Sequence, residues 1–174
     1  MTKPGTLAVF VILLLGSDAM LRGAVGQQKS MREQLAGAWT LISWEQTNAN
    51  GSKLQQFGAD PKGIAFFDAT GHYIISVMRS DRANYNIGNF GQLGQITGDE
   101  GKATAVGTIT YFGTYSVREA DRSIAIHVEA SSFPNWNGTD LERLVDLQTR
   151  RGRGAFALCN PSHSCLAFAV PART

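Results

Sequence analysis

The chain has 174 residues, a hydrophobic fraction of 43%, 19 glycines and a formal net charge of +2. This length fits one domain with its own core, and the composition fits a β-rich chain with many turns. A net charge so close to zero, spread along the chain, excludes the basic patch with which a protein binds nucleic acid.

The N-terminal segment, residues 1–26, has the pattern of a secretory signal peptide. Lys3 supplies the positive charge, residues 7–15 form an uninterrupted apolar run, and residues 24–26 are small enough for a cleavage site. The apolar run is too short to cross a bilayer. We therefore expect cleavage near Gln27, a periplasmic or extracellular location, and no stable membrane anchor. The alternative is an anchor that stays uncleaved.

The mature chain opens with a lead-in at residues 27–34, followed by a first strand at residues 37–44. In the lead-in, Ser30 and Glu33 have the spacing of a capping box, which predicts a short helical turn. After the strand, the pair at residues 50–51 is Asn-Gly, a strong signal for a hairpin turn.

A second hairpin is predicted from residues 64–68 and 72–78, because two apolar runs flank the turn residues 69–71. The connection that follows, residues 83–106, begins rich in Gly and Asn and ends charged. It is long for a connection without structure of its own. We expect a flap or short helix over the mouth of the fold.

Residues 109–117 and 123–130 predict two neighbouring strands across the polar turn at residues 118–122. Such a meander needs further strands to bury its apolar face. Because side chains alternate along a strand, each strand has two distinct faces. One face of the first strand carries Ile109, Tyr111, Gly113, Tyr115 and Val117. The second strand has a polar face with Ser123, Ala125, His127, Glu129 and Ser131. Its apolar face carries Ile124, Ile126, Val128 and Ala130.

The ordered set of motifs in this region resembles the lipocalin-like domain family of bacteria and fungi. The motifs are Tyr-Phe-Gly-Thr-Tyr at residues 111–115, His-Val-Glu at 127–129, and Pro-Asn-Trp-Asn-Gly at 134–138 followed by Arg143. Members of this family are small calycin-type barrels, most without an assigned activity. The resemblance implies an all-β, antiparallel, up-and-down lipocalin-like β-barrel over residues 35–148.

The Gly-x-Trp at residues 37–39 resembles the N-terminal signature of lipocalins. That resemblance implies that Trp39 closes the floor of the barrel. The alternative is a Trp39 that belongs only to the core, which predicts nearly the same burial.

The C-terminal segment, residues 149–174, shows no clear alternation, and it contains both cysteines. One explanation is a divergent final hairpin joined by a disulfide between Cys159 and Cys165, which an oxidising compartment allows. The other is a shift of reading frame near the end of the gene. We favour the frameshift and expect an irregular tail.

The candidate ligand-binding residues depend on which strand face points inward, and the sequence does not decide this. If the polar face is inward, the guanidinium of Arg143 and the carboxylate of Glu129 satisfy each other and orient the polar end of an otherwise apolar ligand. In the alternative, the apolar face forms the core and the polar face is solvated. The residues that would converge are Tyr111, Tyr115, His127, Glu129 and Arg143.

Two arginines at the end of the second hairpin, Arg79 and Arg82, are further candidates. They are expected either to attract an anionic ligand to the mouth or to form a solvated rim. The three histidines are far apart and lack the spacing of metal ligands, so we expect no metal and no cofactor. Ser131 and Ser132 near His127 lack the nucleophile elbow of a hydrolase.

Three functions remain open because a fold does not specify a function. The leading hypothesis is a secreted, non-enzymatic protein that binds a small, partly apolar molecule inside the barrel. The second is an isomerase, cyclase or hydratase that uses His127 or Glu129 as general base and Tyr111 or Tyr115 as acid. The third is an interaction module whose barrel is filled.

Overall fold

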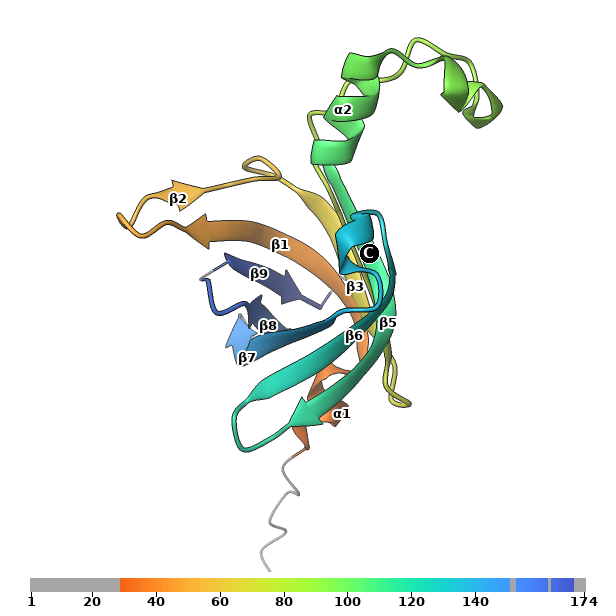
Figure 1. Cartoon of the computed structure of the whole chain (residues 1–174). Coiled ribbons are helices and arrows are strands. Elements are labelled where there is room, and N and C mark those ends of the chain that lie inside the picture. Colours follow the sequence, from red (N-terminus) through yellow and green to blue (C-terminus); the bar gives the residue numbers. More distant parts are fainter. Residues whose placement is uncertain (1–28, 151–152, 163, 171–174) are drawn as a thin grey trace, which may run out of the picture.

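A computed structural model describes residues 29–150, 153–162 and 164–170 (Figure 1). Within these residues, antiparallel strands dominate, and the signal peptide expected at residues 1–26 lies outside them. The strands are β1 (Gly37–Thr47), β2 (Lys53–Leu54), β3 (Lys62–Phe67), β4 (His72–Met78), β5 (Thr108–Arg118), β6 (Ser123–Ser131), β7 (Asp140–Arg150), β8 (Arg153–Cys159) and β9 (Ser164–Ala169). The helices are α1 (Met31–Leu35), η1 (Phe90–Gln95), α2 (Gly98–Val106) and η2 (Pro134–Trp136), where η marks a 3₁₀ helix.

The strands form a closed barrel in the order β1-β3-β4-β5-β6-β7-β8-β9, and β9 pairs back onto β1. The short β2 only extends the hairpin that follows β1, where Gln46 pairs with Leu54. Every neighbouring pair is antiparallel and the order follows the sequence, so the predicted up-and-down topology is confirmed. Closure pairs the strand edges that an open sheet would expose.

The hairpin between β3 and β4 forms as predicted, with Phe67 opposite Tyr73. Its turn is held by the carboxylate of Asp68, which accepts hydrogen bonds from the backbone N–H of Gly71 at 2.7 Å and of His72 at 2.8 Å. Gly71 has φ +108, a conformation that favours glycine. The Asp68 side chain and the conformation of Gly71 are therefore local determinants of this turn, to which Tyr115 adds a hydrogen bond from β5.

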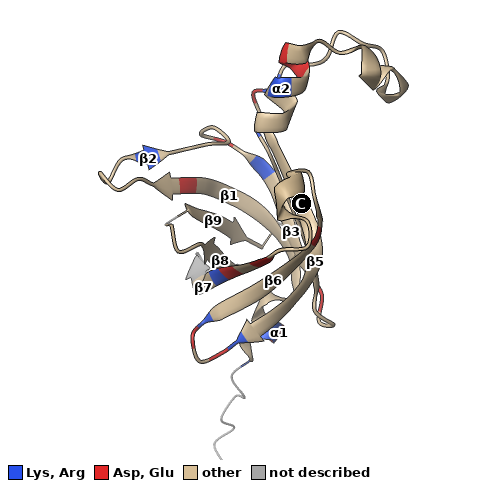
Figure 2. Ribbon diagram, in the orientation of Figure 1, with Lys and Arg blue, Asp and Glu red and all other residues tan. Residues whose placement is uncertain are grey.

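Charged residues are scattered over turns and outer faces, and the view in Figure 2 shows no face of a single sign. The ion pairs among the described residues are solvent-accessible; Arg118 and Glu142, for example, are 2.9 Å apart with both side chains 53% exposed. Pairs of this kind contribute little to stability. The fold is therefore held by its apolar interior.

The core contains a group of aromatic side chains in mutual contact. They pack toward the end of the barrel at which α1 lies, the lower end in Figure 1. Trp39 meets Phe156 edge-to-face at 4.6 Å between ring centroids, and Phe67 meets Tyr115 in the same way at 5.2 Å. Phe168 stacks on Phe156 at 5.1 Å. Edge-to-face and offset contacts of this kind add to the stabilisation that comes from burial itself.

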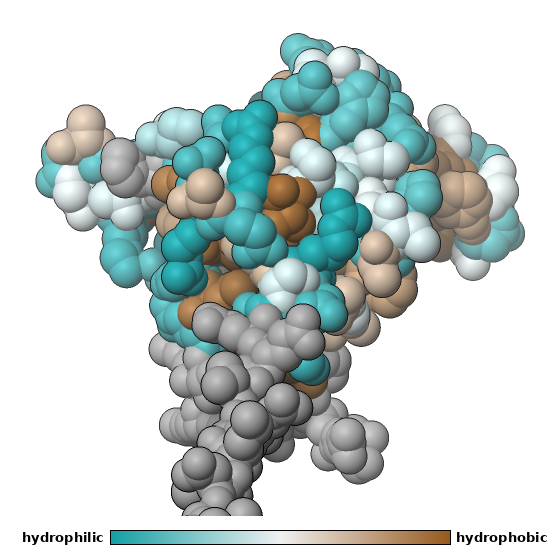
Figure 3. Space-filling model, turned by 90° about the horizontal axis from the view of Figure 1, so that it is seen from below, coloured by the Kyte–Doolittle hydropathy of each residue, from teal (hydrophilic) through white to brown (hydrophobic). Residues whose placement is uncertain are grey.

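The floor of the barrel is closed by α1 and Trp39. The capping box of α1 is present: Ser30 Oγ accepts from the Glu33 N–H at 3.2 Å, and Glu33 Oε2 accepts from the Ser30 N–H at 2.8 Å. Trp39 is buried and donates from Nε1 to the Leu35 carbonyl at 2.7 Å. Trp39 thus closes the floor and belongs to the core at once. From below, Figure 3 shows apolar atoms at this end between hydrophilic side chains.

The long connection between β4 and β5 contains the expected helix, α2, but does not cover the mouth. Thr97 and Glu100 form a capping box at its start, yet none of its residues is buried. Figure 1 shows this connection projecting beyond the upper end of the barrel. Because α2 has no apolar stripe to bury, nothing draws it down onto the opening. No helix in the described part of the chain is long and apolar enough to cross a membrane.

The prediction of an irregular tail beyond residue 149 is wrong, because β8 and β9 are regular strands that complete the barrel. The barrel therefore extends to Ala169 rather than to residue 148. The alternation of apolar and polar residues in β8 and β9 is hard to recognise in the sequence because Ala157 and Ala167 occupy outward positions that usually hold polar residues. The inward positions hold Phe156, Leu158, Leu166 and Phe168, all buried.

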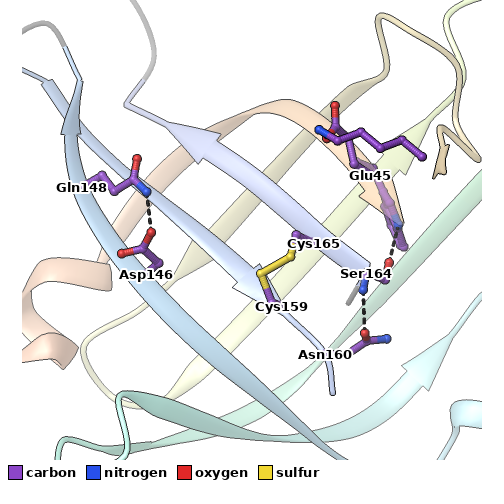
Figure 4. The surroundings of a disulfide bond; sticks show 9 residues. Glu45, Asp146, Gln148, Cys159, Asn160, Ser164 and Cys165 are labelled. Carbon is purple, nitrogen blue, oxygen red and sulfur yellow. Dashed lines mark hydrogen bonds and ion pairs between the residues drawn. A yellow bond between two sulfur atoms is a disulfide. The ribbon is translucent and has the colours of Figure 1, made fainter. Parts of the chain in front are cut away.

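Cys159 and Cys165 lie opposite each other on β8 and β9 and form a disulfide (Figure 4), with 4.1 Å between their Cα atoms. The turn beside them is held by Asn160, whose side-chain oxygen accepts from the Ser164 N–H at 2.8 Å. These contacts are those of a built hairpin. The frameshift explanation rested on the apparent lack of a strand pattern in this segment. The structure supports the other explanation, a genuine final hairpin.

Candidate ligand-binding site

The upper half of the barrel contains a cavity of about 550 Å³ that opens at the end opposite α1. Its walls come from the inward faces of β1, β5, β7 and β9, and its rim from η2 and the end of α2. A cavity of this volume is in the range that holds a small organic ligand. The barrel is therefore packed at one end and hollow at the other.

The walls of the cavity are largely apolar and aromatic. On β1, a register shift between Leu41 and Ser43 brings Trp44 to the inward face, where its Nε1 donates to Ser164 Oγ at 2.9 Å. Phe57, from the loop before β3, packs against Trp44 with ring centroids 4.5 Å apart. The large apolar side chains that line the cavity are Trp44, Phe57, Val106, Ile109, Phe133, Trp136 and Leu166.

A polar cluster of Tyr73, Tyr111 and Arg143 lies at the inner end of this apolar chamber. Tyr111 and Arg143 line the cavity, whereas Tyr73 does not and packs behind Tyr111, with 5.9 Å between the two ring centroids. Arg143 is only 8% exposed. One of its five N–H donors is engaged with the carbonyl of Glu142 at 2.9 Å.

Burial dominates the electrostatics of the two tyrosines. It raises the pKa of Tyr111, and the positive charge of Arg143, together with a hydrogen bond between the two side chains, opposes this rise. Burial likewise raises the pKa of Tyr73, helped by the proximity of Tyr111 and opposed by Arg143. The Tyr73 hydroxyl has no hydrogen-bond partner among the described residues. Both phenols therefore stay protonated at neutral pH and act as donors.

Of the two orientations that the sequence left open, the structure has the apolar one inward, because the side chains of His127 and Glu129 are both exposed on the outside of β6. Ile124, Ile126 and Val128 take the inward face and are completely buried. Burying three aliphatic side chains stabilises by about 1.5–3 kcal/mol each, whereas burying an imidazole and a carboxylate is costly. The aliphatic face therefore points inward.

The two polar side chains have different surroundings outside the barrel. His127 Nδ1 lies 2.8 Å from Asp140 Oδ1 on the neighbouring strand, with 48% of the imidazole side chain exposed. Glu129 sits where the pairing of β6 with β5 shifts register, and a Cβ on Gly113 would lie 2.1 Å from the His127 carbonyl oxygen. The expected pair between Glu129 and Arg143 is absent from the ion pairs of the described residues.

Tyr115, another candidate residue, points inward but does not reach the cavity. Its hydroxyl donates to the Asp68 carbonyl at 2.7 Å, and its ring lies 5.2 Å from the guanidinium carbon of Arg32. Burial raises the pKa of Tyr115, with the charge of Arg32 opposing. This tyrosine therefore belongs to the floor of the barrel rather than to the ligand site.

Arg79 and Arg82 lie near the rim, but neither lines the cavity. Arg79 forms a two-point contact with the carboxylate of Asp81, at 2.9 Å and 2.6 Å. Arg82 donates to Thr108 Oγ1 at 2.9 Å and to the Arg79 carbonyl at 3.2 Å. Because the charge of Arg79 is compensated locally, it is not available to draw an anion into the mouth.

Several residues of the site were not predicted, and only some had a detectable signal. Ile109 lies two residues before Tyr111 on the same strand face, so its place in the site was predictable from alternation. Tyr73 and Trp44 were not predictable, because alternation alone does not say which face of β4 points inward and because the register shift in β1 breaks the alternation that begins at Trp39. Phe57 lies outside the strands, so periodicity gave no indication of its burial.

A family model described as a lipocalin-like domain matches residues 36–166 of this chain. The match reaches across β8 into β9, as expected for a genuine final hairpin. A comparison with curated proteins found no match. Among solved structures, a redesigned β-barrel aligns with 84% of this chain and 100% of its own at 12% identity, with a TM-score of 0.34. A score this low supports no further conclusion.

Proposed function

Because the chain belongs to the lipocalin-like domain family, we propose that it binds a small, partly apolar molecule in the upper half of its barrel. The observation that carries this proposal is the cavity of about 550 Å³ with its apolar walls. Apolar pockets with a few placed polar groups are the usual form of small-molecule sites. Trp44, Phe57 and Leu166 supply the apolar surface, and Tyr111 and Arg143 orient the polar end of the ligand.

We propose that the protein acts in the periplasm or outside the cell. The N-terminal pattern of residues 1–26 and the pairing of Cys159 with Cys165 both support this location. Disulfides persist in oxidising compartments and are rare in the cytosol.

The two alternative functions have less support. The isomerase, cyclase or hydratase hypothesis required His127 or Glu129 as a general base inside the cavity. Both lie outside the barrel, beyond hydrogen-bond reach of a ligand within it. The filled interaction module does not account for a hollow upper half lined by Trp44 and Ile109.

Titration with N-phenyl-1-naphthylamine, a neutral apolar fluorophore, tests the binding proposal. We expect its emission to rise and shift to the blue on binding, with quenching of Trp44 and Trp136 at the cavity wall. Ile109→Trp should weaken binding because the larger ring occupies part of the cavity. Phe112→Trp is the matched control, because Phe112 lies on the outer face of the same strand and is exposed. Absence of binding to the wild-type protein, or equal binding by both variants, contradicts the proposal.

A further inference from the structure

The geometry points to a more specific ligand class: an amphiphile with a single negative charge, whose carboxylate or sulfonate binds Arg143 and Tyr111 while its apolar body lies against Trp44, Phe57 and Leu166. This inference rests on the proposed function, since it names the chemistry of the molecule in the same cavity. It concerns the sign and the number of charges on the ligand.

The first step is that Arg143 is a buried cation whose counter-ion does not come from the described part of the chain. No carboxylate of residues 29–150, 153–162 or 164–170 forms an ion pair with it. Its neighbour Glu142 is paired with Arg118, and Asp140 is paired with His127. A charge that is 8% exposed is costly unless it is paired. A ligand anion would supply that partner through charge-assisted hydrogen bonds.

The second step is that Arg143 is the one charged side chain among the described residues that line the cavity. The other lining side chains are apolar or neutral polar. One cation compensates one negative charge, so a monoanion fits the site better than a dianion such as a phosphate monoester. A cationic ligand would place two like charges in a confined space and is disfavoured.

The third step is that the groups next to Arg143 are hydrogen-bond donors. Tyr111 lines the cavity, and Tyr73 behind it is 3% exposed with a hydroxyl that lacks an acceptor. The protonated phenol of Tyr111 and the guanidinium of Arg143, which both line the cavity, form a site that accepts negative charge. The charge of Glu129 also acts on these groups, but it is the smallest of the causes that set the pKa of Tyr73. Because Glu129 is exposed, water and salt screen its charge.

A matched pair of fluorophores tests the inference. 8-Anilino-1-naphthalenesulfonate is N-phenyl-1-naphthylamine with one added sulfonate, so the two differ by a single negative charge. We expect the wild-type protein to bind the sulfonate more tightly. Arg143→Met should weaken sulfonate binding about 10- to 100-fold and weaken binding of the neutral fluorophore much less. Arg143→Lys should give an intermediate loss, because it keeps the charge and loses the planar fork.

Arg118→Met is the control for charge, since it removes one positive charge from the outer surface and should change neither affinity. In a second arm, dodecanoate should displace the neutral fluorophore from the wild-type protein at lower concentration than dodecanol or dodecyltrimethylammonium. If Arg143→Met does not fold, the displacement experiment and the Arg143→Lys variant still show whether the site prefers a negatively charged ligand.

The outcomes separate the two proposals. If the neutral fluorophore does not bind, the proposed function fails. If it binds, but the sulfonate and dodecanoate have no advantage, or Arg143→Met weakens both fluorophores equally, the inference is overturned and the proposed function stands.

Discussion

Cys159 and Cys165 occupy directly opposed positions on β8 and β9, and their disulfide joins the two strands that complete the barrel. β9 also pairs with β1, so this hairpin connects the last strand of the chain to the first. The bond therefore stabilises the closure of the sheet. It also lies beside Asn160 and Ser164, which line the cavity.

We expect the Cys159→Ser/Cys165→Ser double variant to lose about 2 kcal/mol of unfolding free energy, since the bond closes only a short loop in the unfolded chain. Urea denaturation of oxidised wild-type protein, reduced wild-type protein and the double variant measures this loss. Reduced wild-type protein should match the double variant. Equal stability of all three samples would show that the bond contributes nothing to closure.

The Tyr73 hydroxyl is buried without an acceptor in the described structure. An unsatisfied buried hydroxyl costs about 1–3 kcal/mol. We expect Tyr73→Phe to raise the free energy of unfolding of the ligand-free protein by about 1 kcal/mol, measured by chemical denaturation. Tyr115→Phe is the matched control: its hydroxyl donates to the Asp68 carbonyl, so its removal should lower stability by a similar amount. A loss of stability in Tyr73→Phe would reveal an acceptor such as bound water.

Arg143 and Glu129 lie on opposite sides of the barrel wall, so they should be energetically independent. We expect Arg143→Met to be neutral or stabilising in the ligand-free protein, because it removes an uncompensated buried charge. A double-mutant cycle with Glu129→Gln should give a coupling energy below about 0.5 kcal/mol. A coupling of roughly 1 kcal/mol or more would mean that the two side chains pair in solution.

The Asp68 carboxylate should make the fold sensitive to acid. The hydrogen bond from the His72 N–H is the largest cause that holds the pKa of Asp68 well below its ordinary value, with burial opposing and with further bonds from Thr70 and Gly71. Because the folded-state pKa is the lower one, this stabilisation is fully present above the unfolded-state pKa of about 3.9 and is lost as the pH falls below it.

Asp68→Asn should therefore flatten the decline of stability below about pH 4, measured as the urea midpoint at successive pH values. Thr70→Ala removes one donor and should give an intermediate slope. An unchanged slope in Asp68→Asn would assign the acid sensitivity to other carboxylates.

Several features of this protein were predictable from sequence because they depend on neighbours along the chain. The capping box of Ser30 and Glu33, the turn at Gly71 and the shared face of Tyr111 and Tyr115 are local patterns of spacing and alternation. Such patterns repeat over a few residues and need no distant partner. The antiparallel barrel followed from these elements together with the family resemblance.

The tertiary structure decided what depends on packing between distant strands. Alternation divides β6 into two faces but does not say which is buried; the aliphatic face turned inward because the barrel interior excludes His127 and Glu129. The same closure buried Phe156 and Phe168, although alanines at the outward positions concealed the alternation of β8 and β9. It also left Arg143 inside, apart from the carboxylate expected to pair with it, because strand register rather than charge attraction sets which side chains meet.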